Sequence, residues 1–197
     1  CLSNPEFQKA FTEKVLECLE AAPSREIISV SQNDNNYRCQ CDQCLAIEEE
    51  EGSAAGPILR FVNAVAREVA KKYPDTLVET LAYTYSVDPP KETKPEPNVL
   101  IRLCTYLDNH AVPFSDEKNK PFQEAIEGWA KIAPKLFIWD YTTDFADQWK
   151  LRPNLLNLGA NIRFFAKYPV EGVFSQGAFQ QRTDFAGLRA WLVSQLL

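Results

Sequence analysis

The chain has 197 residues, of which 45% are hydrophobic and 24% charged, and its net charge is −6. This composition is typical of a globular protein with one large or two small domains. The acidic balance argues against a dedicated nucleic-acid-binding protein, and no apolar run approaches the roughly 18 residues that cross a bilayer. The chain begins with Cys1 and contains no Met, so we expect an N-terminal remainder of a longer chain to precede it.

Helix-like and strand-like segments alternate along the chain. The first helix begins at Asn4-Pro5-Glu6, where Asn can cap, Pro fits the first turn and Glu complements the helix dipole. Short apolar-rich runs predict strands, and apolar residues at helical spacing predict the other helices. In chain order we predict a strand over 27–32, a helix that includes 59–69 and stops before Tyr73-Pro74, a strand over 77–85, an extended proline-rich segment over 91–97 and a strand over 98–106. These are followed by a helix over 122–132, a strand over 136–141, a helix over 155–166, a strand over 170–175 and a helix over 184–197 that Asp184 caps. The acidic run 48–51 is interpreted as a solvated helix end.

Five strands with long connections favour a parallel α/β sheet. Two architectures fit this pattern: an open doubly wound sheet, or part of a (β/α)8 TIM-like barrel. No Gly-rich phosphate loop follows a predicted strand, which disfavours the nucleotide-binding form of the open sheet. A complete barrel needs about 250 residues and eight units. We therefore expect residues 1–197 to be a single (β/α) barrel domain, or a fragment made of its C-terminal five units.

Half of the six cysteines lie in one short segment, at Cys39, Cys41 and Cys44. Thiolates at this spacing could share one tetrahedral zinc ion, which would need a fourth ligand such as Cys104 or His110. Three thiolates make a closed, soft site, so a structural metal is expected rather than a catalytic one. Disulfide bonds and free thiols are the alternatives. In either bonded state the cysteines would brace the loop after the first predicted strand.

Motifs spread over nearly the whole chain share one resemblance. They are Cys1-Leu2-Ser3-Asn4-Pro5-Glu6, Val30-Ser31-Gln32-Asn33-Asp34 with the cysteine segment that follows, Leu59-Arg-Phe-Val-Asn63, Tyr73-Pro74, Leu81-Ala-Tyr83-Thr-Tyr85, Pro89-Pro90, Ile138-Trp139-Asp140-Tyr141-Thr142-Thr143 and Gly172-Val-Phe174. In these motifs the chain resembles the bacterial family catalogued as domain of unknown function 4838. The resemblance implies a TIM-barrel domain similar to glycoside hydrolases, in exported proteins (periplasmic, cell-surface or extracellular) of carbohydrate-degrading bacteria. The family has no established activity to carry over.

The carboxyl ends of barrel strands are where active groups lie. Here those ends offer carboxylates, aromatic rings and amides, which are the residue types that a sugar site uses. Aromatic faces stack on the apolar faces of pyranoses, while amides and Arg bind hydroxyl groups. The predicted substrate-binding residues are Asn33, Tyr83, Tyr85, Arg102, Tyr106, Asp108, Trp139, Tyr141 and Gln176.

Asp34 and Asp140 are the candidate catalytic carboxylates, because glycoside hydrolysis needs two carboxyl groups flanking the bond. If the five strands are the last five of eight, Asp34 ends strand four and Asp140 ends strand seven. This arrangement resembles that of many retaining barrel glycosidases, which place their acid/base at the end of strand four and their nucleophile at the end of strand seven, usually as Glu. We predict Asp34 as general acid/base and Asp140 as nucleophile or stabiliser. The alternatives are a turn or cap role for Asp34 and an ion pair with Arg102 for Asp140.

The sequence thus favours a glycoside hydrolase-like domain that acts on a polysaccharide or glycan by carboxylate acid/base catalysis. A non-catalytic carbohydrate-binding or structural module of a larger exported protein is the second interpretation. A metal-dependent hydrolase is the third, although it needs more His and Asp ligands than this chain offers. The expected partner is carbohydrate. No cofactor is expected, apart from the structural zinc that is one of the three alternatives for Cys39, Cys41 and Cys44.

Overall fold

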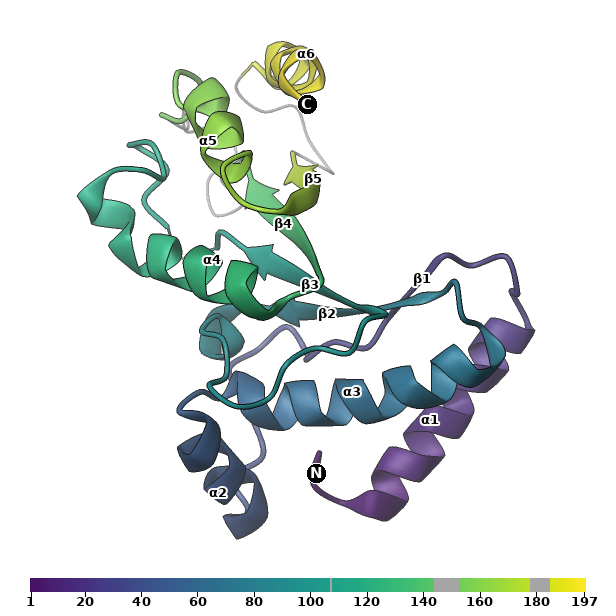
Figure 1. Cartoon of the computed structure of the whole chain (residues 1–197). Coiled ribbons are helices and arrows are strands. Elements are labelled where there is room, and N and C mark those ends of the chain that lie inside the picture. Colours follow the sequence, from purple (N-terminus) through teal and green to yellow (C-terminus); the bar gives the residue numbers. More distant parts are fainter. Residues whose placement is uncertain (107, 144–152, 178–184) are drawn as a thin grey trace.

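A computed structural model describes residues 1–106, 108–143, 153–177 and 185–197. Within these ranges one five-stranded sheet carries the fold (Figure 1). Its strands are β1 (Ile27–Ser29), β2 (Leu77–Ala82), β3 (Val99–Cys104), β4 (Lys135–Tyr141) and β5 (Val170–Gln176). The α-helices are α1 (Pro5–Glu20), α2 (Asp42–Glu51), α3 (Ala55–Lys72), α4 (Lys120–Ile132), α5 (Leu158–Phe165) and α6 (Ala186–Leu196), and the 3-10 turns are η1 (Thr84–Ser86) and η2 (Glu117–Asn119). The predicted cap Asp184 lies outside the described residues.

Every neighbouring pair of strands is parallel, and their order is β1-β2-β3-β4-β5. Each connection therefore advances in one direction around the sheet, as in a (β/α) barrel. A doubly wound sheet instead reverses its strand order at a switch point. The sheet is curled, and α1, α3, α4 and α5 lie around its outer side (Figure 1). The predicted parallel α/β fold is confirmed, and its strand order is that of a barrel segment.

The core lies between the sheet and the outer helices. In β3 and β4 the side chains of Ile101, Leu103, Leu136 and Ile138 are fully buried on the helix side. Because side chains alternate along a strand, the residues between them point to the concave side. Each such aliphatic side chain contributes roughly 1.5–3 kcal/mol by leaving water. The helix-facing positions thus hold the sheet together and leave the concave side for polar and aromatic groups.

Three strands are shorter than predicted: β1 ends at Ser29, β2 at Ala82 and β3 at Cys104. β2 ends at Ala82, and Thr84 adopts a positive φ of 49° at the start of η1. β1 ends at Ser29, and the side-chain amide of Gln32 then donates to the carbonyl oxygen of Tyr83 at 3.1 Å. This hydrogen bond joins the two chain segments that leave β1 and β2.

The connection from β2 to β3 contains no α-helix. Its proline-rich part, which the sequence predicts as extended, packs on α3 in place of a connecting helix. The side chain of Asn63 donates to the carbonyl of Lys94 at 2.8 Å and accepts from the N–H of Glu96 at 3.0 Å. The prediction that residues 48–51 are a solvated helix end was wrong at Glu51, which is fully buried. Its carboxylate anchors this same connection.

Candidate functional site

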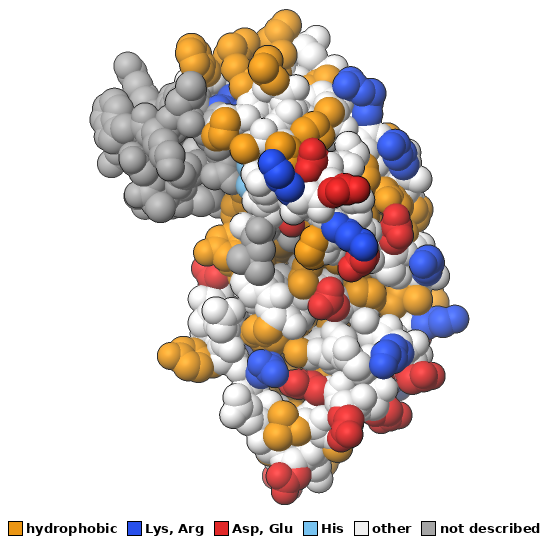
Figure 2. Space-filling model, turned by 90° about the vertical axis from the view of Figure 1, so that its left-hand side faces the viewer, with side chains coloured by type: hydrophobic (Ala, Val, Ile, Leu, Met, Phe, Trp, Pro, Cys, Tyr) orange, Lys and Arg blue, Asp and Glu red, His pale blue; other side chains and the backbone are white. Residues whose placement is uncertain are grey.

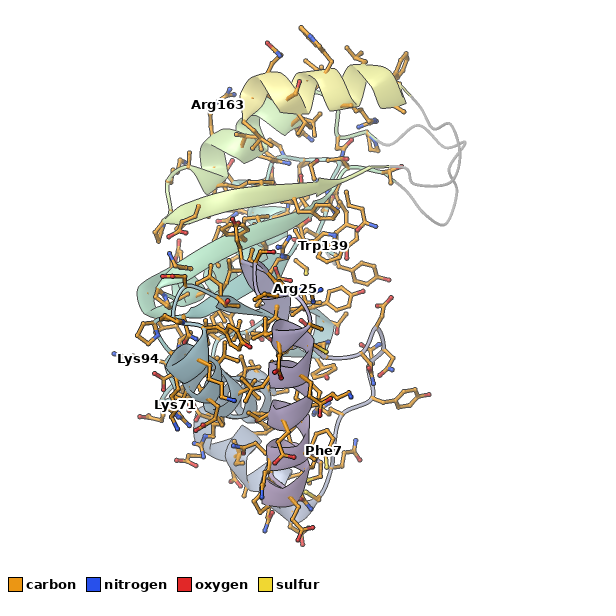
Figure 3. All side chains as sticks on the ribbon, turned by 90° about the vertical axis from the view of Figure 1, so that its right-hand side faces the viewer. Phe7, Arg25, Lys71, Lys94, Trp139 and Arg163 are labelled. Carbon is orange, nitrogen blue, oxygen red and sulfur yellow. The ribbon has the colours of Figure 1, made fainter. Side chains whose placement is uncertain are left out.

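The concave side of the sheet forms a cleft of about 520 Å³ at the carboxyl ends of the strands. Figure 3 shows Trp139 near these strand ends, well separated from Phe7 on α1. The volume lies within the range of small-molecule sites. The residues that line the cleft are Gln32, Asp34, Leu81, Tyr83, Cys104, Tyr106, Trp139, Tyr141 and Gln176.

Four aromatic rings form a continuous row in this cleft. Tyr83 and Tyr106 meet edge to face with ring centroids 5.4 Å apart, and Tyr106 and Tyr141 do so at 5.7 Å. Tyr141 and Trp139 lie nearly parallel, with an angle of 21° between their planes and centroids 6.2 Å apart. Edge-to-face and offset arrangements are the favourable ones for aromatic pairs. Tyr106 is 51% exposed, so the row presents apolar ring surface to solvent.

Asp34 is held at the edge of the aromatic row. The hydroxyl of Tyr83 donates to Oδ1 of Asp34 at 3.0 Å. Burial, together with this hydrogen bond to the carboxylate, raises the pKa of Tyr83 to about 12. Tyr83 therefore keeps its proton, and with it the donated hydrogen bond, throughout the physiological pH range. Asp34 itself is exposed, so its remaining lone pairs are open to a ligand.

An ion pair lies on the concave side below the strand ends. Arg102 Nε donates to Glu79 at 2.9 Å, and the guanidinium lies 5.6 Å from the ring centroid of Phe137 and 6.0 Å from that of Trp139. Arg102 does not line the cleft, and its charge is already matched, so it supports the aromatic row from beneath. Burial raises the pKa of Cys104 to about 12, which makes this thiol a poor nucleophile.

Asp140 faces away from the cleft. It shares the helix side of β4 with Ile138, whereas Trp139 and Tyr141 point to the concave side. Its carboxylate is buried and accepts a hydrogen bond from the hydroxyl of Thr105 at 2.9 Å. The predicted nucleophile role of Asp140 thus has no support from the geometry. The alternative ion pair with Arg102 is not formed either, because Arg102 pairs with Glu79.

Asp108 follows β3 and lies close to Asp140 rather than in the cleft. Burial, and then the charge of Asp140, raise the pKa of Asp108 to about 7. Two carboxyl groups that repel each other in this way share a site in which one is readily protonated. The neighbouring His110 is buried, with Nε2 3.1 Å from the carbonyl oxygen of Thr105. Its ring meets that of Phe114 edge to face at 5.6 Å.

Two predicted binding residues border a different cavity. Asn33 and Tyr85 line a space of about 310 Å³ between α1, α3 and the cysteine segment. Tyr85 also lies 5.8 Å from the guanidinium carbon of Arg38. The predicted residues that the structure does bring together are Asp34, Tyr83, Tyr106, Trp139, Tyr141 and Gln176.

Sequence reasoning missed three residues of the cleft: Gln32, Leu81 and Cys104. Two of them could have been found from strand periodicity. Leu81 and Cys104 share the concave side of β2 and β3 with residues two positions away, such as Glu79 and Arg102. The position of Gln32 depends on its contact with the turn after β2, for which the sequence carries no local signal.

Four cysteines form a separate cluster that could hold a metal ion. The sulfur atoms of Cys1, Cys39, Cys41 and Cys44 all lie within 4.8 Å of one another. The backbone N–H of Cys44, then the hydroxyl of Ser3 and the thiol of Cys39, lower the pKa of Cys41 to about 7.

The fourth ligands predicted for these cysteines were wrong. Cys104 lines the cleft instead, and His110 is buried behind the strand ends. Cys1 is the fourth cysteine of the cluster, in the place that was predicted for Cys104 or His110.

One comparison with known proteins identifies a family. The model of a family described as "Domain of unknown function (DUF4838)" matches residues 1–197. No curated protein matches the chain. The matched region contains both the aromatic cleft and the cysteine cluster.

Proposed function

The chain belongs to the family described as a domain of unknown function (DUF4838), and from the geometry of its cleft we propose that it binds a carbohydrate. The observation that carries this proposal is the row of rings from Tyr83 to Trp139. Tyr83 is buried, but Tyr106, Tyr141 and Trp139 are partly exposed. Such rings offer flat apolar surface to the apolar face of a pyranose. Asp34 and Gln176, at the rim of the same cleft, supply polar atoms for its hydroxyl groups.

The surface charge is compatible with a neutral ligand. On the face shown in Figure 2, the described Lys and Arg side chains are interspersed with Asp and Glu side chains. The overall charge is −6, which does not favour an anionic polymer as partner. No described helix is long and apolar enough to cross a membrane.

Hydrolysis of the bound glycan is the second candidate function. The hydrogen bond from Tyr83 fixes the carboxyl group of Asp34, as a general acid/base would require. Glycoside hydrolysis usually needs a second carboxyl group across the scissile bond. Among the described residues that line the cleft, Asp34 is the one carboxylate. The geometry therefore favours binding over hydrolysis.

A glycan array with the full-length protein tests the binding proposal. We expect Tyr106→Ala to weaken binding of the selected glycan about tenfold, a loss of about 1.4 kcal/mol, because it removes an exposed ring of the row. The matched control is Tyr37→Ala, since Tyr37 is 89% exposed and lies outside the cleft. Equal losses in both variants, or no glycan bound by the wild-type protein, would contradict the proposal.

Asp34→Asn separates binding from hydrolysis. A glycosidase screen is run with the wild-type protein and this variant on the glycans that the array selects. Hydrolysis that disappears in Asp34→Asn while binding remains identifies an enzyme with Asp34 as its acid/base. Binding without hydrolysis by either protein identifies a carbohydrate-binding module. Equal hydrolysis by both proteins removes Asp34 from the mechanism.

The cysteine cluster lies outside this cleft, and we propose a structural zinc for it rather than a catalytic one. Four thiolates fill the coordination sphere of a tetrahedral ion, which leaves no open position for water or substrate.

A further inference from the structure

The cysteine cluster joins two segments that are far apart in the sequence. Cys1 lies just before α1, whereas Cys39, Cys41 and Cys44 span the loop after β1 and the first turn of α2. The sulfur of Cys1 lies 3.4 Å from that of Cys41 and 3.7 Å from that of Cys44. All four cysteines are unbonded to one another, and four sulfur ligands are therefore available at one point.

The spacing of the sulfur atoms matches a tetrahedral metal site. A Zn–S bond is about 2.3 Å long, so sulfurs at the corners of a tetrahedron around zinc lie about 3.8 Å apart. The distances from Cys1 are close to this value, and each is well above the length of about 2.05 Å of a disulfide bond. Soft thiolate ligands select ions such as Zn²⁺ over Mg²⁺ or Ca²⁺.

The surroundings of the cluster favour negatively charged sulfur. Cys41 is the N-cap of α2, and Cys44 lies in the first turn of the same helix. The N-terminus of a helix carries exposed N–H groups and a partial positive charge, which stabilise anions. The hydroxyl oxygen of Ser3 lies 3.1 Å from the sulfur of Cys1 and 3.4 Å from that of Cys44. Hydrogen bonds of this kind orient metal ligands.

From this arrangement we infer that Cys1, Cys39, Cys41 and Cys44 bind one Zn²⁺ ion, with Cys1 as the fourth ligand. The thiols release their protons as the ion binds, and no electron transfer is involved. The ion fastens the segment before α1 to the loop that runs from Asp34 to α2. The inference rests on the structural role proposed for the cluster and is independent of carbohydrate binding.

Metal titration of the full-length protein tests the inference. The reduced, metal-free protein is titrated with Co²⁺ and then with Zn²⁺. We expect one Co²⁺ per chain, with the thiolate-to-metal charge-transfer absorption of a tetrahedral site, and its displacement by Zn²⁺. Cys1→Ser should weaken Co²⁺ binding at least tenfold and lower the charge-transfer absorption by about a quarter, since three of four thiolates remain. Cys1 is exposed, so this substitution leaves the fold intact, which circular dichroism verifies.

Two further variants sharpen the result. Cys18→Ser is the matched control, because Cys18 is also an exposed thiol but lies outside the cluster, and it should bind Co²⁺ like the wild type. Ser3→Ala should keep the absorption band and weaken binding about tenfold, as expected for a group that orients the ligands.

Three outcomes would overturn the inference. They are an absence of stoichiometric Co²⁺ binding, identical titrations of Cys1→Ser and wild type, and disulfides among these cysteines in the protein isolated without reductant. Metal binding by a protein that binds no glycan would refute the proposed function and leave this inference standing.

Discussion

Three aspartates lie near the strand ends, and each has a different environment. Asp34 is exposed and accepts a hydrogen bond from Tyr83. Asp140 is buried on the helix side of β4 with Thr105 as its donor. Asp108 lies near Asp140, and its pKa is raised to about 7. Carboxyl groups whose environments differ in this way take different roles. Of the three, Asp34 lines the described cleft and is therefore the residue to test for function. Asp108 and Asp140 lie outside the cleft, and we expect them to affect stability.

Asp108 should make the protein less stable at neutral pH. The unfolded chain loses this proton near pH 3.8, whereas the folded chain keeps it until about pH 7. Between these values the folded state binds more protons, so its free energy of unfolding falls as the pH rises. We expect Asp108→Asn to raise the free energy of unfolding by about 2 kcal/mol at pH 8 and to change it little at pH 3.5. Urea titrations across this range measure the effect. An unchanged pH dependence in Asp108→Asn, or the same change in the exposed control Asp75→Asn, would contradict it.

The connection between β2 and β3 shows how a polar network can replace a helix. Glu51, the last residue of α2, accepts from the Nε of Arg60 on α3 at 2.8 Å. It also accepts from the backbone N–H groups of Glu92 and Thr93, both at 3.0 Å, and from the hydroxyl of Thr93. In a helix these backbone N–H groups would be paired with carbonyl oxygens of the same helix, whereas here they donate to the carboxylate of Glu51. The network fixes the chain between two strands whose ends form the cleft.

Glu51→Gln should destabilise the protein strongly. Burial by itself would raise the pKa of Glu51, but the donors from Thr93, Arg60 and Glu92 outweigh it and lower the pKa to about 2. The stabilisation is therefore present above pH 4.5 and is lost as the pH falls towards 2. We expect Glu51→Gln to cost about 3 kcal/mol at pH 7, because it leaves the Arg60 charge without its buried partner. Chemical denaturation measures the cost.

Glu50→Gln is the matched control for this experiment. Glu50 pairs with the same Arg60 at 2.9 Å, but its side chain is 59% exposed. Exposed ion pairs contribute less than about 1 kcal/mol. A similar loss in both variants would show that the buried carboxylate has no special part in the network.

Taken as a whole, the molecule holds its curled sheet through packing on the outer side. Phe114, in the loop between β3 and α4, is fully buried. Its ring centroid lies 4.9 Å from that of Phe122 on α4 and 5.5 Å from that of Phe165 on α5. The backbone N–H of Phe114 also donates to the side chain of Asn161 on α5. This aromatic cluster ties two helices to the loop that leaves the cleft.

Phe114→Ala should therefore be as costly as a substitution inside a helix or strand. We expect a loss of about 3–5 kcal/mol in the free energy of unfolding, from lost burial and the cavity that remains. Leu156→Ala, at a residue that is 95% exposed, should change stability by less than about 0.5 kcal/mol. Thermal or urea unfolding compares the two variants. A loss below about 1 kcal/mol for Phe114→Ala would show that this cluster is not part of the core.

Local patterns in the sequence were enough to predict the order of the strands, most of the helices and most of the cleft, whereas α2 (Asp42–Glu51) was not predicted beyond a helix end at 48–51. Strand periodicity is a property of neighbouring residues, so Trp139 and Tyr141 could be placed together at the end of β4. The same periodicity also carried the signal that Asp140 lies on the opposite side, with Ile138. The expectation for Asp140 instead followed the resemblance to barrel enzymes, which carries no information about the side that a residue faces.

The sequence by itself therefore determined the fold class, the approximate positions of the strands and the aromatic character of the cleft, because short-range spacing encodes them. Only the tertiary structure decided that Cys1 joins Cys39, Cys41 and Cys44, that Glu51 is buried and that Phe114 belongs to the core. Each of these depends on segments far apart in the chain meeting in space. Such contacts follow from how the helices pack around the curled sheet, and no local spacing rule contains that packing.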